Sequence, residues 1–304
     1  MKHALLRYLY FPLVWLALSF SAHAQIQAVS WFEGDNITVC PAKIIEVSPP
    51  DFSEDKCETV SPSKVDPQSR MIWVKTKINL DAIRGPKGEP LSLYISGKMS
   101  SEAYLNGEFV GQNGVVGEDA KSEIVGKMDA EFFPRQDLFL LGENEIIFRA
   151  SSQNGILHLH SPLHMVAIAP SGVFGNRVFP EAVPALVTLS LFLMGALYFG
   201  VMAVIASTRI SFLTLSLICV FAGAQLLFET MRGLISYDYT IHDYRLLGIT
   251  ACSTAFGLSV AFHIFRTFKM PKLLWTMVGL IGFTLFGVFA IKGFDLKALS
   301  LIHI

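Results

Sequence analysis

Long apolar segments in the C-terminal part constrain this chain more than any other feature. The four segments are 182–208, 210–231, 246–266 and 272–292. Each is long enough to cross the roughly 30 Å hydrocarbon core of a bilayer, which takes about 20 helical residues. We therefore predict a helical transmembrane region over 182–304 with four clear helices. The last residues, 294–304, are apolar again and are interpreted as the start of a fifth helix.

Charge divides the chain into two unlike parts. Gln25 to Glu181 holds 14 basic and 21 acidic residues, whereas Ala182 to Ile304 holds only 8 and 4. Overall the chain is 16% charged with a mean hydropathy of +0.48, against about 25% charged residues in a typical soluble domain. This composition excludes a disordered chain and a nucleic-acid-binding protein that depends on a basic surface. The lipid bilayer is the first expected partner.

The first 24 residues have the pattern of a secretory signal peptide. Lys2 and Arg7 precede an apolar run, and Ala22-His23-Ala24 places small residues where a signal peptidase cleaves. We predict a signal peptide over 1–24; the alternative is an uncleaved anchor, for which the apolar run is short. Export places the region that follows outside the cytoplasm.

Alternating polarity over 25–169 predicts an all-β domain. In 71–79, Ile72, Val74, Thr76 and Ile78 share one side, as expected for a half-buried strand. Short strands of this kind with no long amphipathic helix indicate an antiparallel β-sandwich or jelly roll. The prolines in 170–181 predict a linker between this domain and the membrane region.

The sharpest local signal is Asn106-Gly107 between strand-like residues. This pair favours a two-residue hairpin turn with positive φ at both positions. Such a turn pairs Leu105 with Glu108 and places Tyr104 opposite Phe109 on one face of the sheet.

Two cysteines fall within the exported region. Cys40 and Cys57 are expected to form a disulfide in an oxidising compartment, and two unpaired thiols are the alternative. Cys219 and Cys252 lie in apolar runs and are interpreted as packing residues. No Cys-x-x-Cys spacing supports a metal site.

The sequence offers little chemistry for catalysis. His158 and His160 share a face of one strand and would suit a metal, but a solvent-facing pair is the preferred interpretation. Acidic pairs such as Glu118/Asp119 fit a solvated surface better than an acid/base pair. We predict no catalytic residue, no metal and no cofactor, and therefore no enzyme.

Polar residues at the end of the second apolar segment stand out. Glu229 and Arg232 are three residues apart, which allows an ion pair on one helix face. We interpret them as a polar pair at the membrane interface, with a sensing role as the alternative.

Three segments are similar to galactose-binding-like jelly rolls, namely "IWVKTKINL", "LSLYISGKMSSEAYLNGEFVGQNG" and "LFLLGENEIIFRASSQNG". The order of the whole chain resembles the bacterial seven-transmembrane receptors with diverse intracellular signalling modules. In that family an exported β-domain precedes seven helices and a cytoplasmic output domain, such as a diguanylate cyclase or a histidine kinase. This chain has four clear helices and no output domain, so the resemblance implies a truncated version.

The resemblance implies a sensory module of the bacterial inner membrane, expected as a homo-oligomer. Its periplasmic β-domain would sense a ligand, with a carbohydrate as one candidate, and relay the signal through the helices. The first alternative is an envelope enzyme or transporter with a carbohydrate-binding-like accessory domain. A scaffold that binds another envelope protein is the second.

Overall fold

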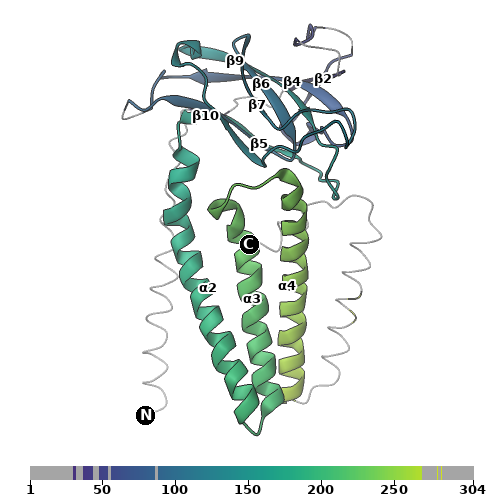
Figure 1. Ribbon diagram of the computed structural model, residues 1–304, viewed down its shortest axis with the longest axis vertical. Helices are drawn as coiled ribbons and strands as arrows, with labels where there is room; N and C mark the ends of the chain where they lie inside the picture. Colours follow the sequence, from purple (N-terminus) through teal and green to yellow (C-terminus); the bar gives the residue numbers. More distant parts are fainter. Residues whose placement is uncertain are drawn as a thin grey trace.

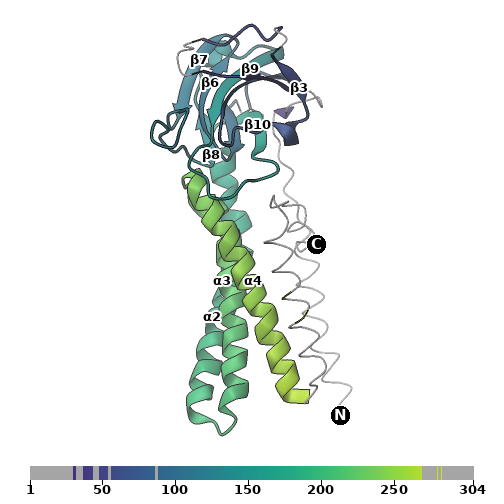
Figure 2. The ribbon, with the colours of Figure 1, turned by 90° about the vertical axis from the view of Figure 1, so that its right-hand side faces the viewer.

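The structure, a computed structural model, describes residues 30–31, 37–43, 48–53, 56–85 and 88–268, and positions 279 and 282. In this part of the chain two antiparallel β-sheets are followed by three long apolar helices (Figure 1, Figure 2). The predicted β-sandwich and membrane region are therefore confirmed in outline. The predicted signal peptide, and the fourth predicted helix apart from those two positions, lie outside the described residues.

The sandwich has a four-stranded and a six-stranded sheet, with antiparallel pairing between neighbouring strands. The four-stranded sheet, in order, consists of β1 (Ser30–Trp31), β10 (Leu163–Pro170), β5 (Leu91–Gly97) and β8 (Asp129–Phe132). The six-stranded sheet, in order, consists of β3 (Glu58–Val60), β2 (Ile37–Pro41), β4 (Met71–Leu80), β9 (Gly142–Ser151), β6 (Ser100–Leu105) and β7 (Glu108–Asn113). The short 3-10 helices η1 and η2 span Pro62–Lys64 and Gln136–Leu138. Figure 1 places β5 and β10 nearer the helices than β9 and β4.

Alternation along the two longest strands builds the core between the sheets. On β4, Ile72, Val74 and Ile78 are buried in one apolar cluster, as their spacing predicts. On the adjacent β9, Ile146 and Phe148 enter the same cluster. Side chains of successive residues point to opposite faces of a strand, so the intervening lysines of β4 remain on the outer face.

The Asn106-Gly107 turn forms as predicted. Asn106 has a φ of 50° and Gly107 a φ of 86°, the positive values that this turn requires. The register pairs Tyr104 with Phe109, whose ring centroids lie 5.4 Å apart in an edge-to-face arrangement. The side chain of Asn106 also accepts a hydrogen bond of 2.8 Å from the backbone N–H of Glu145, which ties the turn to β9.

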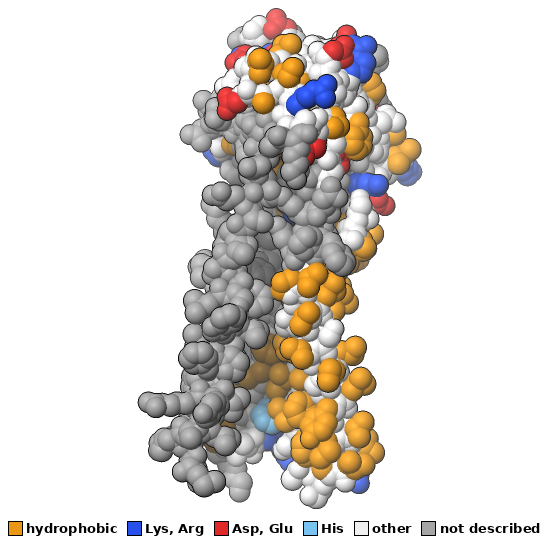
Figure 3. All heavy atoms as spheres, turned by 90° about the vertical axis from the view of Figure 1, so that its left-hand side faces the viewer, with side chains coloured by type: hydrophobic (Ala, Val, Ile, Leu, Met, Phe, Trp, Pro, Cys, Tyr) orange, Lys and Arg blue, Asp and Glu red, His pale blue; other side chains and the backbone are white. Residues whose placement is uncertain are grey.

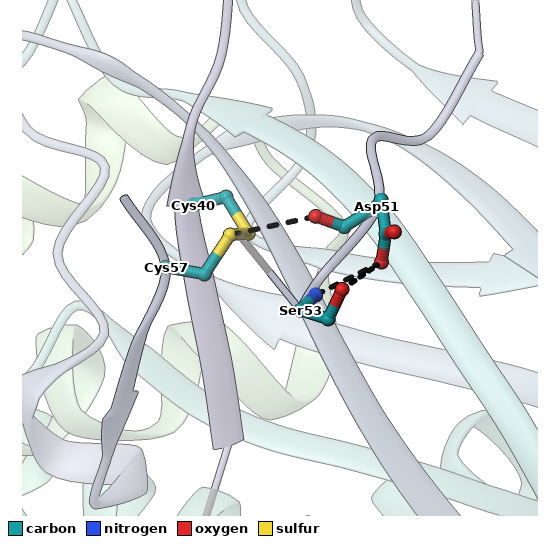
Figure 4. The surroundings of a disulfide bond; sticks show 4 residues. All are labelled: Cys40, Asp51, Ser53 and Cys57. Atoms are coloured by element: carbon teal, nitrogen blue, oxygen red, sulfur yellow. Dashed lines mark hydrogen bonds between the residues drawn. A yellow bond between two sulfur atoms is a disulfide. The ribbon is translucent and has the colours of Figure 1, made fainter. Parts of the chain in front are cut away.

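Cys40 and Cys57 are joined by a disulfide on the outer side of the six-stranded sheet (Figure 4). Cys40 on β2 packs against Trp73 in a small apolar cluster apart from the main core. Asp51, within the loop closed by the bond, accepts hydrogen bonds from the backbone N–H and the hydroxyl of Ser53. These two bonds lower the pKa of Asp51 and order the loop beside the disulfide.

Within residues 173–268 three helices follow the sandwich and pack in chain order, α2 against α3 and α3 against α4 (Figure 2). They are α2 (Val173–Ile205), α3 (Arg209–Leu234) and α4 (Tyr239–Phe268). The stretches Ala182–Ile205, Arg209–Leu234 and Tyr239–Phe268 are long and apolar enough to cross a membrane. On the face seen in Figure 3, hydrophobic side chains predominate over the described part of the helices, whereas charged ones gather mainly on the sandwich. The protein is a membrane protein with a β-sandwich outside its membrane-spanning part.

The segment 170–181 is not the linker that the sequence predicted, because the helix α2 begins at Val173. The turn before it is made by Gly172, which has a φ of 73°. The prolines misled the prediction because a proline removes one backbone hydrogen bond and kinks a helix without having to end it. Two residues therefore separate β10 from α2, and the sandwich has no long tether.

The helix α4 also begins earlier than predicted, at Tyr239 and not at Leu246. Its first turns include His242 and Asp243, which are 3% and 0% exposed. A sequence pattern based on apolar residues ends where such polar residues occur. They are buried here because the sandwich covers them.

We predict that replacing both disulfide cysteines, Cys40→Ala with Cys57→Ala, lowers the free energy of unfolding by about 3 kcal/mol. The bond closes a loop with a sequence separation of 17, and loops of this length give stabilisation of that order in the chain-entropy model. Tryptophan fluorescence during guanidinium unfolding of the full chain in detergent measures the change. Cys219→Ala, at a free thiol, is the control, and equal midpoints for both proteins would contradict the prediction.

Candidate functional site at the junction of sandwich and helices

Backbone hydrogen bonds attach the connection between α3 and α4 to the sandwich. The N–H of Met128 donates to the carbonyl of Tyr237 at 3.0 Å, and the N–H of Tyr239 donates to Gly126 at 2.9 Å. Between them Lys127 and Asp238 form an antiparallel bridge. The connection thus pairs with the segment just before β8 like a very short additional strand. We call this region, where the sandwich contacts the ends of α3 and α4, the junction.

A buried ion pair lies at the centre of the junction. Lys98, in the turn between β5 and β6, contacts Asp243 on α4, with 2.7 Å between Nζ and Oδ2. Their side chains are 1% and 0% exposed. The same carboxylate oxygen accepts hydrogen bonds from the N–H groups of Ile156 at 2.8 Å and Leu157 at 3.0 Å. Lys98 also donates to the carbonyl of Leu157, so the loop that contains Ile156 and Leu157 binds both charged side chains.

Burial and pairing act on Lys98 in opposite directions. Burial lowers the pKa of Lys98, and the adjacent Asp243 carboxylate partly offsets this effect. Transferring two charges from water into the protein costs several kcal/mol per ion. Only close pairing and further hydrogen bonds offset this cost. The second carboxylate oxygen, Oδ1 of Asp243, is buried without a hydrogen-bond partner among the described residues. The stability of this ion pair is therefore sensitive to any change in the residues around it.

A second polar cluster surrounds the first residue of α4. The hydroxyl of Tyr239 donates to the carboxylate of Glu123 and accepts a hydrogen bond of 3.0 Å from the N–H of Asn154. Glu123, 6% exposed, also accepts from the hydroxyl of Ser151 at 2.5 Å and from the N–H of Gln153 at 2.9 Å. Glu123 thus links the last residue of β9 to the start of a membrane helix.

The end of α3 is held by a third polar contact. The guanidinium of Arg232 makes two hydrogen bonds to Asp129 on β8, with Nη2–Oδ1 at 2.6 Å and Nε–Oδ2 at 2.9 Å. It also donates to the hydroxyl of Ser96 on β5 at 2.7 Å. Burial acts to raise the pKa of Asp129. The hydrogen bonds from Arg232 and its charge outweigh this effect, so the pKa of Asp129 lies below its usual value.

This contact gives Arg232 of the predicted Glu229–Arg232 pair a partner on the sandwich that the sequence did not indicate. Arg232 forms its ion pair with Asp129, and the carboxylate of Glu229 accepts a hydrogen bond of 2.8 Å from Gln225 one turn earlier. The backbone carbonyl of Glu229 accepts from Arg245 of α4 at 2.9 Å. Spacing on one helix suggested a local pair, but a carboxylate from the sandwich competes for the arginine with better, two-point geometry.

Two histidines meet at the edge of the junction. The rings of His164 on β10 and His242 on α4 lie 5.8 Å apart, and Nδ1 of His242 is 3.1 Å from the hydroxyl of Tyr237. The other candidate histidines are elsewhere: His158 lies 3.4 Å from Asp66, and His160 is exposed. Among the described residues no cluster of three or more His, Cys, Asp or Glu is arranged to hold a metal ion.

Of the charged residues of the junction, only Arg232 was apparent from the sequence. Lys98, Glu123 and Asp243 come from a turn, a loop and a helix start, and no local pattern connects them. The one available signal was a lysine directly after the strongly apolar strand "LSLYISG". Pairing between such distant residues is a property of the tertiary structure.

Comparisons with known proteins add no family. No family model matches the sequence, and no curated protein matches it. Among solved structures, the chain is similar to a β-glucosidase from Kluyveromyces marxianus at 15% identity with a TM-score of 0.25. The match covers 51% of this chain, and the chain spans 21% of the length of that enzyme. A TM-score this low supports no inference about fold or activity.

We predict that Lys98→Met destabilises the full chain by about 3–5 kcal/mol, because it leaves a buried carboxylate without its counter-charge. Lys98→Met combined with Asp243→Leu should be less destabilised than the sum of the single variants, since an apolar pair replaces the ionic one. Chemical unfolding in detergent measures both. Lys77→Ala is the control, because its ion pair with Glu143 is 54% and 58% exposed and such a change costs within about 0.5 kcal/mol. Additive losses in the double variant would contradict the pairing.

We also predict that Gly155→Ala loosens the junction. A Cβ at this position would meet Nζ and Cε of Lys98 and lie 3.2 Å from Oδ2 of Asp243. Hydrogen–deuterium exchange should accelerate in the peptides that contain Met128 and Tyr239, whose amides hold the junction. Gly257→Ala, where a Cβ meets nothing within 4 Å, should leave this exchange unchanged. Unchanged exchange in Gly155→Ala would contradict the prediction, because it would show that the loop accommodates the added methyl group without disturbing the ion pair.

Proposed function

We propose that the chain is the sensory module of a bacterial inner-membrane signalling protein. Its β-sandwich lies in the periplasm and binds a ligand there. The resulting shift is relayed through the helices toward an output domain on the cytoplasmic side. The observation that supports the proposal most directly is the junction, where a buried ion pair holds α4 to the sandwich and a partly exposed one holds the end of α3.

The junction suits a relay because one short stretch of the sandwich holds both helices. Ser96 and Lys98, at the end of β5, contact Arg232 of α3 and Asp243 of α4 respectively. Asp129 of the adjacent β8 completes the contact with α3. A displacement at this end of β5 therefore acts on both helices at once. A flexible tether between sandwich and membrane would dissipate the same displacement.

The buried pair also favours two discrete states over a gradual response. A polar contact in a dry interface is either made in full or broken at a cost of several kcal/mol. Packed interfaces of this kind switch between arrangements and do not deform continuously. A ligand shifts such an equilibrium only by its difference in affinity for the two states. A carbohydrate is the first ligand class to test, since the resemblance to galactose-binding-like domains suggests it.

The relay can be tested without knowing the ligand. Spin labels at Ser207 and Thr267, both exposed at the far end of the helices, report their separation in the full chain in nanodiscs. Replacing Cys219 and Cys252 by alanine removes the free thiols. We predict that Asp243→Asn shifts the measured distance by about 1–2 Å, the scale of helix shifts in switching proteins. Lys77→Ala should leave it unchanged, and an unchanged distance in Asp243→Asn would contradict the relay.

The same labelled protein then tests ligands. A panel of neutral hexoses and amino sugars, added to the parent protein, should include one that moves the distance in a concentration-dependent way. Asp243→Asn should bind that sugar yet respond less, because its junction is already loosened. A sugar that binds without any change of distance in the parent would favour a binding module without signalling.

A further inference from the structure

The lengths of α3 and α4 set the depth of the junction relative to the bilayer. The hydrocarbon core takes about 20 helical residues at 1.5 Å each. Counted from the exposed Arg209 and Arg266 at the far end, this length reaches Glu229 on α3 and Leu246 on α4. The two counts agree, because Arg245 donates to the backbone carbonyl of Glu229 at 2.9 Å. The edge of the core therefore lies close to this contact.

The first turns of α4 lie just beyond that edge. Asp243 and Tyr239 precede Leu246 by three and seven residues, a rise of about 5–10 Å. Each headgroup layer of a bilayer is about 5–8 Å thick, so Asp243 lies within it and Tyr239 lies just beyond its outer edge. The loops of the sandwich that contact them share this depth. Figure 1 and Figure 2 both show loops of the sandwich reaching down to the level where α4 begins.

Two isoleucines in these loops are exposed. Ile124 follows Glu123, the acceptor for Tyr239, and its side chain is 62% exposed. Ile156 donates its N–H to Asp243, and its side chain is 55% exposed. Both lie within two residues of a contact to the first turns of α4. We call Ile124 and Ile156 the rim.

The side of α4 that carries Asp243 is opposite the side that packs on α3, where Arg245 and Gly248 contact Phe228. Residues four apart lie on one face of a helix, so Tyr239, Asp243 and Leu247 form a column. The first two are covered by the sandwich, whereas Leu247, one turn deeper, is 39% exposed. Tyr244, beside this column, is 61% exposed and has the chemistry of an interfacial aromatic anchor. Exposed apolar surface of α4 thus begins one turn deeper than the part of the helix that the sandwich covers.

We propose that the rim inserts into the headgroup layer of the leaflet next to the sandwich, so that the sandwich rests on the bilayer surface. The occupant of this surface is lipid, because the helix that these loops contact carries the exposed side chains Leu247 and Tyr244 one turn deeper. Exposed isoleucine side chains are stabilised there by transfer from water, as in interfacial segments of peripheral membrane proteins. This inference depends on the depth of the junction and is independent of any ligand.

Fluorescence quenching by lipid tests the proposal on the full chain. A bimane probe is placed on Ile124→Cys or Ile156→Cys, in protein that retains the Cys40–Cys57 disulfide but has alanine at both free cysteines. The protein is reconstituted in phosphatidylcholine vesicles, a fraction of whose lipids carry bromine near the headgroup end of the acyl chain. Both rim probes should lose fluorescence to a similar extent as a probe at Tyr244→Cys.

Leu141→Cys provides the matched control. Its side chain is 66% exposed, and it precedes β9 at the end opposite Ser151, about 30 Å along the strand from the junction. This probe should keep its fluorescence. Rim probes that are quenched no more than the control would overturn the proposal. The proposal would also be overturned if the rim probes were shielded from water but not quenched by brominated lipid, which would indicate a protein partner instead.

Discussion

The pairing of Lys98 with Asp243 is the contact on which the relative position of the two parts of this protein depends. Neither charge has water to stabilise it, since both side chains are essentially without exposed surface. Each would cost several kcal/mol if buried alone, so the turn after β5 and the second turn of α4 must meet for either to be tolerated. Two backbone N–H groups from the Ile156–Leu157 loop complete the arrangement. Electrostatics therefore fixes a geometry that apolar packing alone would leave adjustable.

Contacts of Tyr239 with the sandwich explain why α4 can begin where it does. The first N–H groups of a helix lack partners within the helix and need acceptors from elsewhere. For Tyr239 the acceptor is the carbonyl of Gly126, and its hydroxyl is satisfied by Glu123 and Asn154. A polar helix start at the edge of a bilayer is therefore stable because the sandwich supplies its partners. At this point the start of the membrane helix depends on hydrogen-bond partners from the sandwich.

Much of the fold followed from local patterns in the sequence. Alternation predicted the buried face of β4, and Asn106-Gly107 predicted both the turn and its register. The length of the apolar segments predicted the three membrane helices that the described residues contain. These features succeed because each is decided by neighbours along the chain.

The junction did not follow from such patterns, because its partners are distant in sequence. Arg232 seemed matched to Glu229 by helical spacing, but it binds Asp129, 103 residues away. The start of α4 was missed for a related reason. A polar residue such as Asp243 is typical of a loop, and its burial is explained only by its contact with the distant Lys98. The predicted linker at 170–181 failed because prolines were given more weight than the helical residues around them. Each error marks a place where tertiary contacts override local preference.

The attachments of all three helices converge on one edge of the four-stranded sheet. Glu131 of β8 accepts the N–H of Gly172 at 2.9 Å, just before α2 begins, and Asp129 of the same strand binds the end of α3. The adjacent β5 leads into Lys98, which binds α4. Because these groups stand on paired strands, β8 cannot move relative to β5 without straining at least one helix contact. Motions that preserve every contact carry sandwich and helices together, whereas a motion that separates Lys98 from Asp243 must break a buried ion pair.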